Sequence, residues 1–219
     1  MGTARRPIGI VSVAFGRVGV REASARAAGL GFAHVDCSVD AVAALDDAEL
    51  ATLPVPVGDR LSGLEILPGC TSMVHRARDE TSFDRAVAKL RTVPDARIEA
   101  GPGSVAGSVA GAEALCAAVP GLRLTVDTGH VACWGEDPVP LLHLADVVQL
   151  RQAAAGRPQL WPDEGGDVDF AAVLAELDRL DFHGLVSVEY FDLPDLGWPL
   201  EDPVGHAVAL AAHVRALMD

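Results

Sequence analysis

Basic residues are scarce in this chain of 219 residues. It contains 17 Lys and Arg, with Lys89 the single lysine, against 31 Asp and Glu, which gives a formal net charge of −14. The arginines are scattered along the chain and form no basic stripe. Because so acidic a surface repels a phosphate backbone, the sequence predicts no nucleic-acid partner.

Long hydrophobic runs and closely spaced cysteines are also absent. No stretch reaches the roughly 18 consecutive apolar residues that a membrane-spanning helix needs, so we expect no membrane contact. The apolar run 8–15 follows Arg5 and Arg6, but it contains glycine and serine and lacks a small-residue cleavage pattern, which argues against a signal peptide. The four cysteines form no Cys-x-x-Cys pair, so we expect reduced thiols and a cytoplasmic location.

What the sequence does contain is an alternation of short apolar runs with alanine-rich segments of helical spacing. Eight runs predict strands, at Ile8–Val13, Ala33–Cys37, Val55–Val57, Ser72–Val74, Ala96–Glu99, Leu122–Asp127, Val147–Leu150 and Leu185–Glu189. Helices are predicted at Arg21–Ala28, Val42–Leu53, Ser82–Thr92, Gly107–Ala118, Pro138–Ala145, Phe170–Leu180 and Pro203–Met218. This order predicts an α/β fold, a shortened (β/α)8 TIM barrel that spans residues 1–219 as one domain.

Two features qualify this prediction. Asp59–Cys70 is rich in Gly, Pro and Ser, so the helix between the third and fourth strands is expected to be weak or missing. Such a gap would expose an apolar patch, which favours a homodimer. A doubly wound open sheet is the alternative fold, but no Gly-x-Gly-x-x-Gly follows the first strand, as its dinucleotide-binding members would require.

Polar residues end four of the predicted strands, and a barrel builds its active site at such ends. Because side chains alternate along a strand, these residues converge if their faces point inward. Converging carboxylates repel one another unless a cation neutralises them. Oxygen ligands favour Mn, Mg or another hard to borderline divalent ion, with the ligands Glu99, Asp127, Gln149 and Glu189. In the simpler alternative, the carboxylates only cap helices or pair with arginines at the rim.

The same segments resemble the xylose isomerase-like barrel superfamily of sugar isomerases and epimerases. The resemblance lies in 126–130 (VDTGH), 147–152 (VVQLRQ), 163–170 (DEGGDVDF) and 184–189 (GLVSVE). It covers the last 125 residues or so well and the first 95 or so loosely. By this resemblance, Glu99, Asp127 and Glu189 are expected to hold one divalent metal (Mn, Mg, Zn or Co), and His130 to contact the substrate.

The sequence departs from the family at the seventh predicted strand, where the family has His-x-x-Asp and this chain has 149–152 (QLRQ). Gln149 still offers a carbonyl oxygen, but it is a weaker ligand than histidine for most transition metals, so metal affinity is expected to be reduced. Arg151 brings a fixed positive charge that suits a carboxylate or phosphate on the substrate. A rim arginine paired with an acidic residue is the plainer interpretation of Arg151.

Further candidates lie near the same strand ends. His75 occupies a position where relatives often carry an active-site histidine. Trp134, Phe191 and Trp198 are among the aromatics that fall in late loops above the expected site, where they could stack on a sugar ring. His34 and Asp36 share a face of the second predicted strand and are candidates for the pocket.

These observations favour a metal-dependent isomerase or epimerase of a sugar, polyol or keto-sugar in carbohydrate metabolism. Glu99 and Glu189 would act as base and acid in proton transfer next to a carbonyl. One alternative is a dehydratase (a lyase) of a cyclic polyol or keto acid that uses the same site. Another is a non-catalytic sugar-binding barrel with a degraded metal site. The family's AP endonucleases are disfavoured, because the acidic charge opposes DNA.

Overall fold

In the computed structural model, the described residues are 6–61, 80–92, 96–101 and 104–219. They form a curled parallel sheet of seven strands in the order β3-β2-β1-β7-β6-β5-β4. The strands are β1 (Gly9–Val11), β2 (Val35–Ser38), β3 (Val57–Leu61), β4 (Arg97–Glu99), β5 (Arg123–Asp127), β6 (Ala145–Leu150) and β7 (Leu185–Val188). The first and last strands in the chain pair with each other, Ile10 opposite Val188, as they do where a barrel closes.

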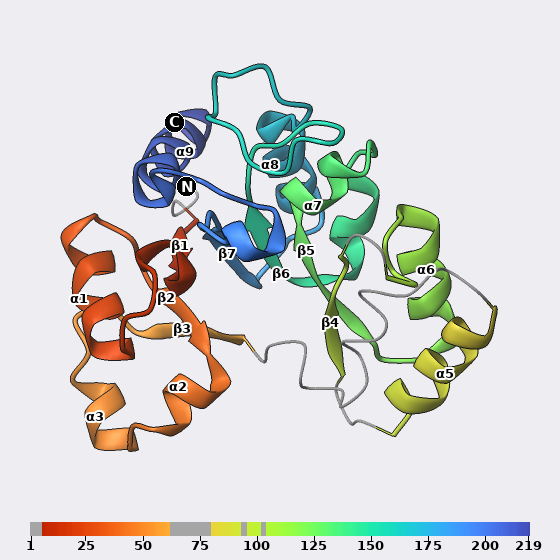
Figure 1. Ribbon diagram of the computed structural model, residues 1–219, viewed down its shortest axis with the longest axis horizontal. Helices are drawn as coiled ribbons and strands as arrows, with labels where there is room; N and C mark the ends of the chain where they lie inside the picture. Colours follow the sequence, from red (N-terminus) through yellow and green to blue (C-terminus); the bar gives the residue numbers. More distant parts are fainter. Residues whose placement is uncertain (1–5, 62–79, 93–95, 102–103) are drawn as a thin grey trace.

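Helices surround the curled sheet on its outside (Figure 1). The α-helices are α1 (Val20–Gly29), α2 (Val39–Ala43), α3 (Asp47–Ala51), α5 (Glu80–Leu90), α6 (Val109–Ala118), α7 (Thr128–Cys133), α8 (Phe170–Arg179) and α9 (Pro203–Leu217). Short 3-10 turns lie at η1 (Ser12–Phe15), η2 (Val139–Leu144) and η3 (Pro194–Leu196). The core between sheet and helices is aliphatic, with Leu115, Leu124, Leu177 and Leu210 fully buried.

The two edges of the described sheet, β3 and β4, are joined by an ion pair. Arg97 of β4 donates to both carboxylate oxygens of Asp59 of β3, at 2.6 and 2.8 Å. Strands that are 38 residues apart in the chain therefore approach one another across the open side of the curled sheet. This architecture confirms the predicted α/β fold and shortened barrel. The predicted strand Ser72–Val74 and most of the weak crossover segment lie outside the described residues.

Three sequence-based boundaries were wrong, each for a local reason. The predicted strand Val55–Val57 lies later, at β3, because Pro56 has no N–H to donate and the ladder begins after it. The predicted helix Val42–Leu53 is two short helices, since Asp46 caps α3 in a capping box with Glu49 and so starts a new helix. The predicted helix Pro138–Ala145 is a 3-10 turn that leads directly into β6.

Two other expectations concern the surroundings of the chain. Within the described ranges, no helix combines the length and the apolar character needed to cross a membrane. Cys37, Cys116 and Cys133 are free thiols in this structure, while Cys70 lies outside the part described.

Candidate active site

The C-terminal end of β5 forms the centre of the site. Asp127 ends the strand, is fully buried and caps the short helix α7. Its Oδ1 accepts hydrogen bonds from the backbone N–H groups of Gly129 at 2.7 Å and His130 at 3.3 Å. Because an N-cap accepts from the first turn, the strand end, the helix start and the carboxylate position are set by the same residue.

Arg151 lies against the other oxygen of Asp127. It comes directly after β6, its side chain is completely buried, and its Nη2 donates to Asp127 Oδ2 in an ion pair. Burial opposes ionisation of Asp127, but the charges of Arg151 and then His130 outweigh it and hold the pKa of this carboxyl below its usual range. The pair is therefore charged, carboxylate against guanidinium, in the interior of the sheet.

The three residues that start α7 also position Arg151. The Thr128 hydroxyl donates to the Arg151 carbonyl at 3.0 Å and accepts from its backbone N–H at 2.9 Å. At Gly129 a methyl group would lie 2.4 Å from Arg151 Nε and 2.9 Å from its Cβ and Cγ, so only glycine leaves room for the arginine stem. Asp127 thus supplies the counter-charge of Arg151, Thr128 fixes the backbone of Arg151, and Gly129 leaves space for its side chain.

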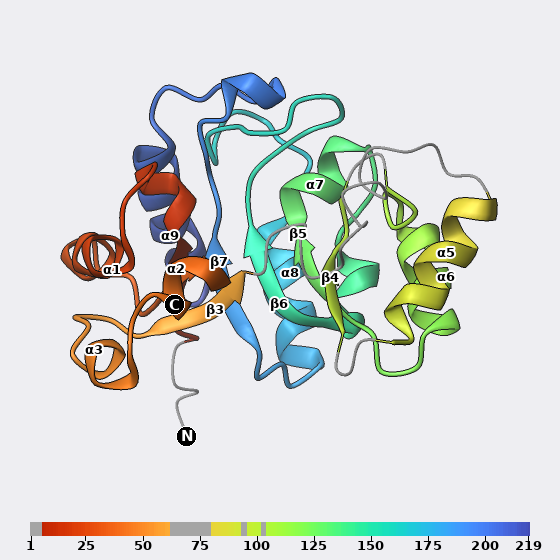
Figure 2. The ribbon, with the colours of Figure 1, turned by 60° about the horizontal axis from the view of Figure 1, so that its bottom comes forward.

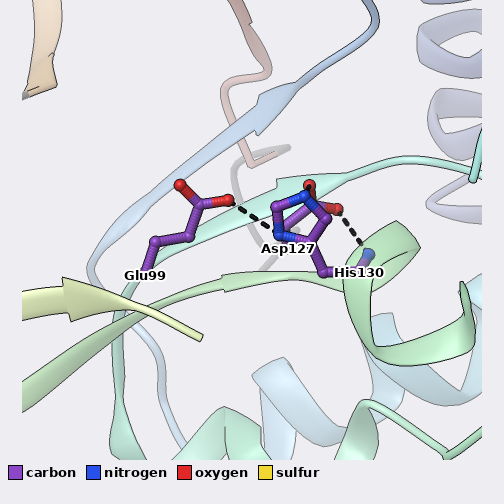
Figure 3. Close-up of side chains that lie close together, drawn as sticks. All are labelled: Glu99, Asp127 and His130. Carbon is purple, nitrogen blue, oxygen red and sulfur yellow. Dashed lines mark hydrogen bonds and ion pairs between the residues drawn. The ribbon is translucent and has the colours of Figure 1, made fainter. Parts of the chain in front are cut away.

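Glu99 and His130 approach the centre from the side of β4. His130 Nδ1 lies 2.9 Å from Glu99 Oε1, and its Nε2 lies 3.6 Å from Asp127 Oδ2. Figure 3 shows Glu99, from the end of β4, pointing toward the imidazole of His130 on α7. The Glu99 side chain keeps 43% of its surface exposed, whereas that of His130 keeps 11%. The sequence predicted His130 as a substrate contact, and its contact with Glu99 was not anticipated.

Glu189 follows β7 and is buried on the opposite side of Asp127. Burial, reinforced by the negative charges of Glu99 and Asp127, raises the pKa of Glu189 well above its usual range. Its carboxyl shares a hydrogen bond with Asp127, in which the protonated Glu189 is the donor. The surroundings of Glu189 therefore favour its protonated, acid form more than water does.

Several buried polar atoms of this site have no hydrogen-bond partner among the described residues. They are Nε2 of His130, Oε1 of Gln149, and Nε and Nη1 of Arg151, whereas Nδ1 of His130 faces Glu99 Oε1 in the ion pair described above. Nε1 of Trp134, at the end of α7, is also unpaired. Gln149 lies between Asp127 and Ser187 in the sheet register, so its orphaned oxygen belongs to the same centre. Buried polar groups are normally paired, and such a concentration of unpaired atoms indicates a place for a ligand.

Aromatic rings cover the guanidinium. The Arg151 Cζ lies 4.7 Å from the ring centroid of Phe191 and 5.4 Å from that of Trp198. These two rings stack on each other at 5.3 Å, and Trp198 also meets the edge of His130. The aromatic loop after β7 was expected above the site, and its stacking on Arg151 follows from the attraction of a cation to ring faces.

The distances between the possible ligand atoms of this site would suit a divalent ion, but the charge and the hydrogen bonds around Asp127 would not. Glu99, Asp127 and His130 each offer one ligand atom, and these atoms lie within 4.8 Å of one another, which makes a possible metal site. However, both oxygens of Asp127 are already bonded, and Arg151 occupies the cation position beside them. A guanidinium in contact with a ligand repels a second cation. As arranged, the residues do not fit a divalent ion.

The predicted site residues therefore divide into two groups. Glu99, Asp127, His130 and Arg151 come together, with Gln149 opposite Asp127 in the sheet, Glu189 under the influence of the charges of Glu99 and Asp127, and Trp134 at the end of α7. His75 lies outside the described residues. Sequence reasoning missed Thr128 and Gly129, although their position directly after Asp127 was a signal that could have identified them.

A second buried polar cluster, which we term the His34 cluster, lies across β2, β3, β4 and β7. Its members are His34, Asp36, Asp59, Arg97 and Ser187. The Ser187 hydroxyl donates to Asp36 Oδ2 and lies 3.0 Å from His34 Nε2, while the backbone N–H of Asp59 donates to Asp36 Oδ1 at 2.7 Å. Burial raises the pKa of Asp36 to about 7. The pocket role considered for His34 and Asp36 gains no support from these saturated contacts.

The chain is similar to known proteins over nearly its whole length. A family model described as "Xylose isomerase-like TIM barrel" matches residues 6–214. No curated protein matches the sequence. Among solved structures, an L-ribulose 3-epimerase is 16% identical with a TM-score of 0.73, covering 98% of this chain and 95% of that one.

Two further solved structures are similar over nearly their whole length. A D-allulose 3-epimerase from Methylomonas sp. is 16% identical with a TM-score of 0.71, covering 99% of both chains. A protein described as a probable 3-DHS dehydratase from Bacillus anthracis is 13% identical with a TM-score of 0.66, covering 97% of both chains. At such identities, the likeness establishes a shared fold.

Proposed function

This chain belongs to the xylose isomerase-like TIM barrel family, and we propose that it is an epimerase or isomerase of a small sugar, polyol or keto-sugar. The reaction is proton transfer at a carbon next to a carbonyl group. Structural neighbours that are described as 3-epimerases of L-ribulose and D-allulose support this class of reaction. The substrate is a small molecule that enters at the C-terminal ends of the strands, where barrels of this kind build their sites.

The observation that carries the proposal is the contrast between two glutamates on either side of the Asp127–Arg151 pair. Glu189 is buried, and burial together with the neighbouring carboxylates raises its pKa well above the usual range, which favours its protonated, acid form. Glu99 keeps 43% of its side chain exposed and lies on the side of β4. Two carboxyl groups in contrasting environments are the usual arrangement for an acid and a base that act in one reaction.

In the proposed reaction Glu99 removes the proton from the carbon next to the carbonyl, which leaves an enediolate. Glu189 then delivers its proton, either to the opposite face of the same carbon, which gives the epimer, or to the neighbouring carbon, which gives the isomer once the hydroxyl proton of the enediolate has moved to the other oxygen. The positive charge of Arg151 stabilises the enediolate oxygen, and His130 binds a substrate hydroxyl. Exchange with water returns both glutamates to their starting protonation states.

A dehydratase is the second candidate, and Arg151 is the observation that favours it. Its Nε and Nη1 are buried without partners in the described structure, and a guanidinium with free N–H groups suits a substrate carboxylate. Loss of water after the same proton abstraction would then give an unsaturated product. One structural neighbour is described as a dehydratase, which agrees with this alternative.

The test is incorporation of solvent deuterium. The protein is incubated in D2O with a panel of ketoses, keto-sugars and inososes, and the products are analysed by NMR and by ultraviolet absorbance. An epimerase or isomerase gives deuterium at the carbon next to the carbonyl with a new epimer or isomer. A dehydratase gives a new absorbance and a product that has lost water. Saturable binding without deuterium exchange would contradict both and would leave the non-catalytic sugar-binding barrel.

The sequence also predicted a divalent metal held by Glu99, Asp127, Gln149 and Glu189. Relatives with this reaction would use such an ion to polarise the substrate carbonyl. In this chain the ligand assignment remains a prediction, and no step above depends on it. Metal analysis of the purified protein decides whether these residues hold a divalent metal.

A further inference from the structure

The most unusual residue of this protein is Arg151, because its charge is buried in the interior and only part of its guanidinium is bonded. It is fully buried and lies among the largest fully buried side chains. Isolated buried charges are costly, so a buried arginine needs a built environment to hold it. Four independent features provide that environment here.

The counter-charge is the first feature, and it comes from the residue at which relatives are expected to bind a metal. Asp127 directs Oδ1 to the helix N–H groups and Oδ2 to Arg151 Nη2. The carboxylate thus has no oxygen that is free of a donor. A metal ligand at this position would need Oδ2, which the guanidinium holds.

The second and third features belong to the start of α7. The Thr128 hydroxyl bonds both the N–H and the C=O of Arg151, which fixes the backbone from which the side chain starts. Gly129 has no Cβ, and a methyl group there would overlap Nε and the stem of Arg151. These contacts are specific for an arginine that folds back over the helix start, and a metal ion would require neither of them.

The aromatic loop after β7 is the fourth feature. Phe191 and Trp198 present their faces to the guanidinium within 5.4 Å. Such faces stabilise a delocalised cation, and Phe191 is itself buried. A hydrated divalent ion needs oxygen and nitrogen ligands, for which these rings are no substitute.

We propose that the guanidinium of Arg151 is a built-in cation that replaces the divalent metal at the centre of this barrel. Gln149 agrees with this exchange, because a neutral amide beside a guanidinium avoids the repulsion that a protonated histidine would add. The remaining N–H groups of Arg151 are the donors that receive an anionic substrate oxygen, either an enediolate oxygen or a carboxylate. This last statement rests on the proposed function, whereas the replacement of the metal does not.

Metal binding by the folded wild-type protein is the decisive measurement. The protein is treated with a chelator, dialysed and titrated with Co2+, with binding followed by visible absorbance and calorimetry. Elemental analysis is run on the protein as purified. We expect no stoichiometric metal and no saturable Co2+ binding at the site. One equivalent of Co2+ that is lost in His130→Ala would overturn the proposal, whether or not any sugar is turned over.

The reciprocal experiment removes the built-in cation. In Arg151→Met, Co2+ can approach Glu99, Asp127 and His130, so the affinity for Co2+ should rise by at least about tenfold, the scale on which neighbours of metal ligands act. Adding Gln149→His should raise it again. Arg157→Met, at an exposed arginine of the loop after β6, is the matched control and should bind no Co2+. A folded Arg151→Met protein without this gain would contradict the proposal.

A further variant addresses folding. Arg151→Met leaves the Asp127 charge buried without its partner, which is strongly destabilising. Asp127→Asn combined with Arg151→Met removes both charges and should recover a large part of the lost thermal stability without binding Co2+. Recovery of stability by Co2+ in Arg151→Met, but not in the double variant, is the expected signature of an ion that takes the place of the guanidinium. Equal effects of Co2+ on both variants would refute the exchange.

Discussion

Two polar clusters are buried in this barrel, and they differ in how completely their hydrogen bonds are made. In the His34 cluster, defined above, no buried side-chain atom of the described structure lacks a partner. In the Arg151 cluster, comprising Glu99, Asp127, His130, Gln149, Arg151 and Glu189, His130, Gln149 and Arg151 all carry unpaired buried atoms. Both clusters lie on the same sheet, and β7 contributes to each, with Ser187 within the strand and Glu189 directly after it.

This difference in unpaired atoms indicates that the His34 cluster is structural and that the Arg151 cluster binds a ligand. The His34 ring packs where Gly9 and Gly58 leave no Cβ, and each of its neighbours bonds the next. Such a saturated network stabilises the fold and has no donor to spare. The Arg151 cluster holds its charge in position with strong contacts yet keeps N–H groups and an amide oxygen unused, which is costly for stability and useful for binding.

Replacement of Glu189, the proposed proton donor of the Arg151 cluster, should have the largest effect, which is on kcat. Glu189→Gln cannot deliver a proton, so kcat on the substrate identified in D2O should fall by about 10²- to 10⁴-fold. Thermal unfolding should change little, because glutamine matches glutamate in size and is uncharged, like the protonated carboxyl that the raised pKa of Glu189 favours. Glu113→Gln, at an exposed position of α6, is the control and should keep wild-type turnover. A fully active Glu189→Gln enzyme would refute the assignment.

The pH dependence of stability should be governed in part by the His34 cluster. Burial raises the pKa of Asp36 from 3.8 to about 7 in the folded state, so the folded protein binds this proton more tightly than the unfolded chain. The resulting stabilisation is complete below pH 3.8 and is lost as the pH rises through about 7.

Asp36→Asn should remove that slope. The free energy of unfolding of the wild type, relative to the variant, should fall between these two pH values by about 1.4 kcal/mol per unit of pKa shift and then level off. Urea unfolding at several pH values measures it, and the comparison with Asn cancels the contribution of Glu189. Parallel curves for the two proteins would mean that Asp36 ionises normally.

The packing of Arg151 on α7 can be tested at a glycine. Gly129→Ala introduces a methyl group 2.4 Å from Arg151 Nε, so either the arginine or the helix start must move. We expect a loss of about 1–3 kcal/mol in the free energy of unfolding, as for other overpacked sites. Gly29→Ala, where a methyl group meets nothing within 4 Å, is the matched control and should not destabilise the protein. Equal stability of the two variants would argue against close packing of the Arg151 side chain on Gly129.

A loss of stability of similar size, without a loss of turnover, is expected when the hydroxyl that links the His34 cluster is removed. Ser187→Ala leaves Asp36 and His34 without their shared partner and should cost about 1–3 kcal/mol in chemical unfolding. Turnover should stay near the wild-type value, because the Arg151 cluster is unchanged. A large loss of activity with unchanged stability would reverse the roles that we give to the two clusters.

Strand ends and helices with strong periodicity were predictable from the sequence. Asp127, with the apolar run before it, predicted both the end of β5 and a site residue, and the helix predicted at Phe170–Leu180 lies within one residue of α8. Local capping changed what periodicity alone suggested. Asp46 divides one predicted helix into α2 and α3, and Pro56 shifts β3 along the chain.

The sequence by itself determined that acidic side chains end neighbouring strands and that Gln149 and Arg151 depart from the pattern of the family, because alternation and strand order follow from the chain alone. Only the tertiary structure decided which cation meets Asp127. That depends on how the arginine side chain turns after β6, on the space that Gly129 leaves and on rings that arrive from a loop 40 or more residues later. Such side-chain directions arise from packing between distant segments, and they decide where the positive charge of this site lies.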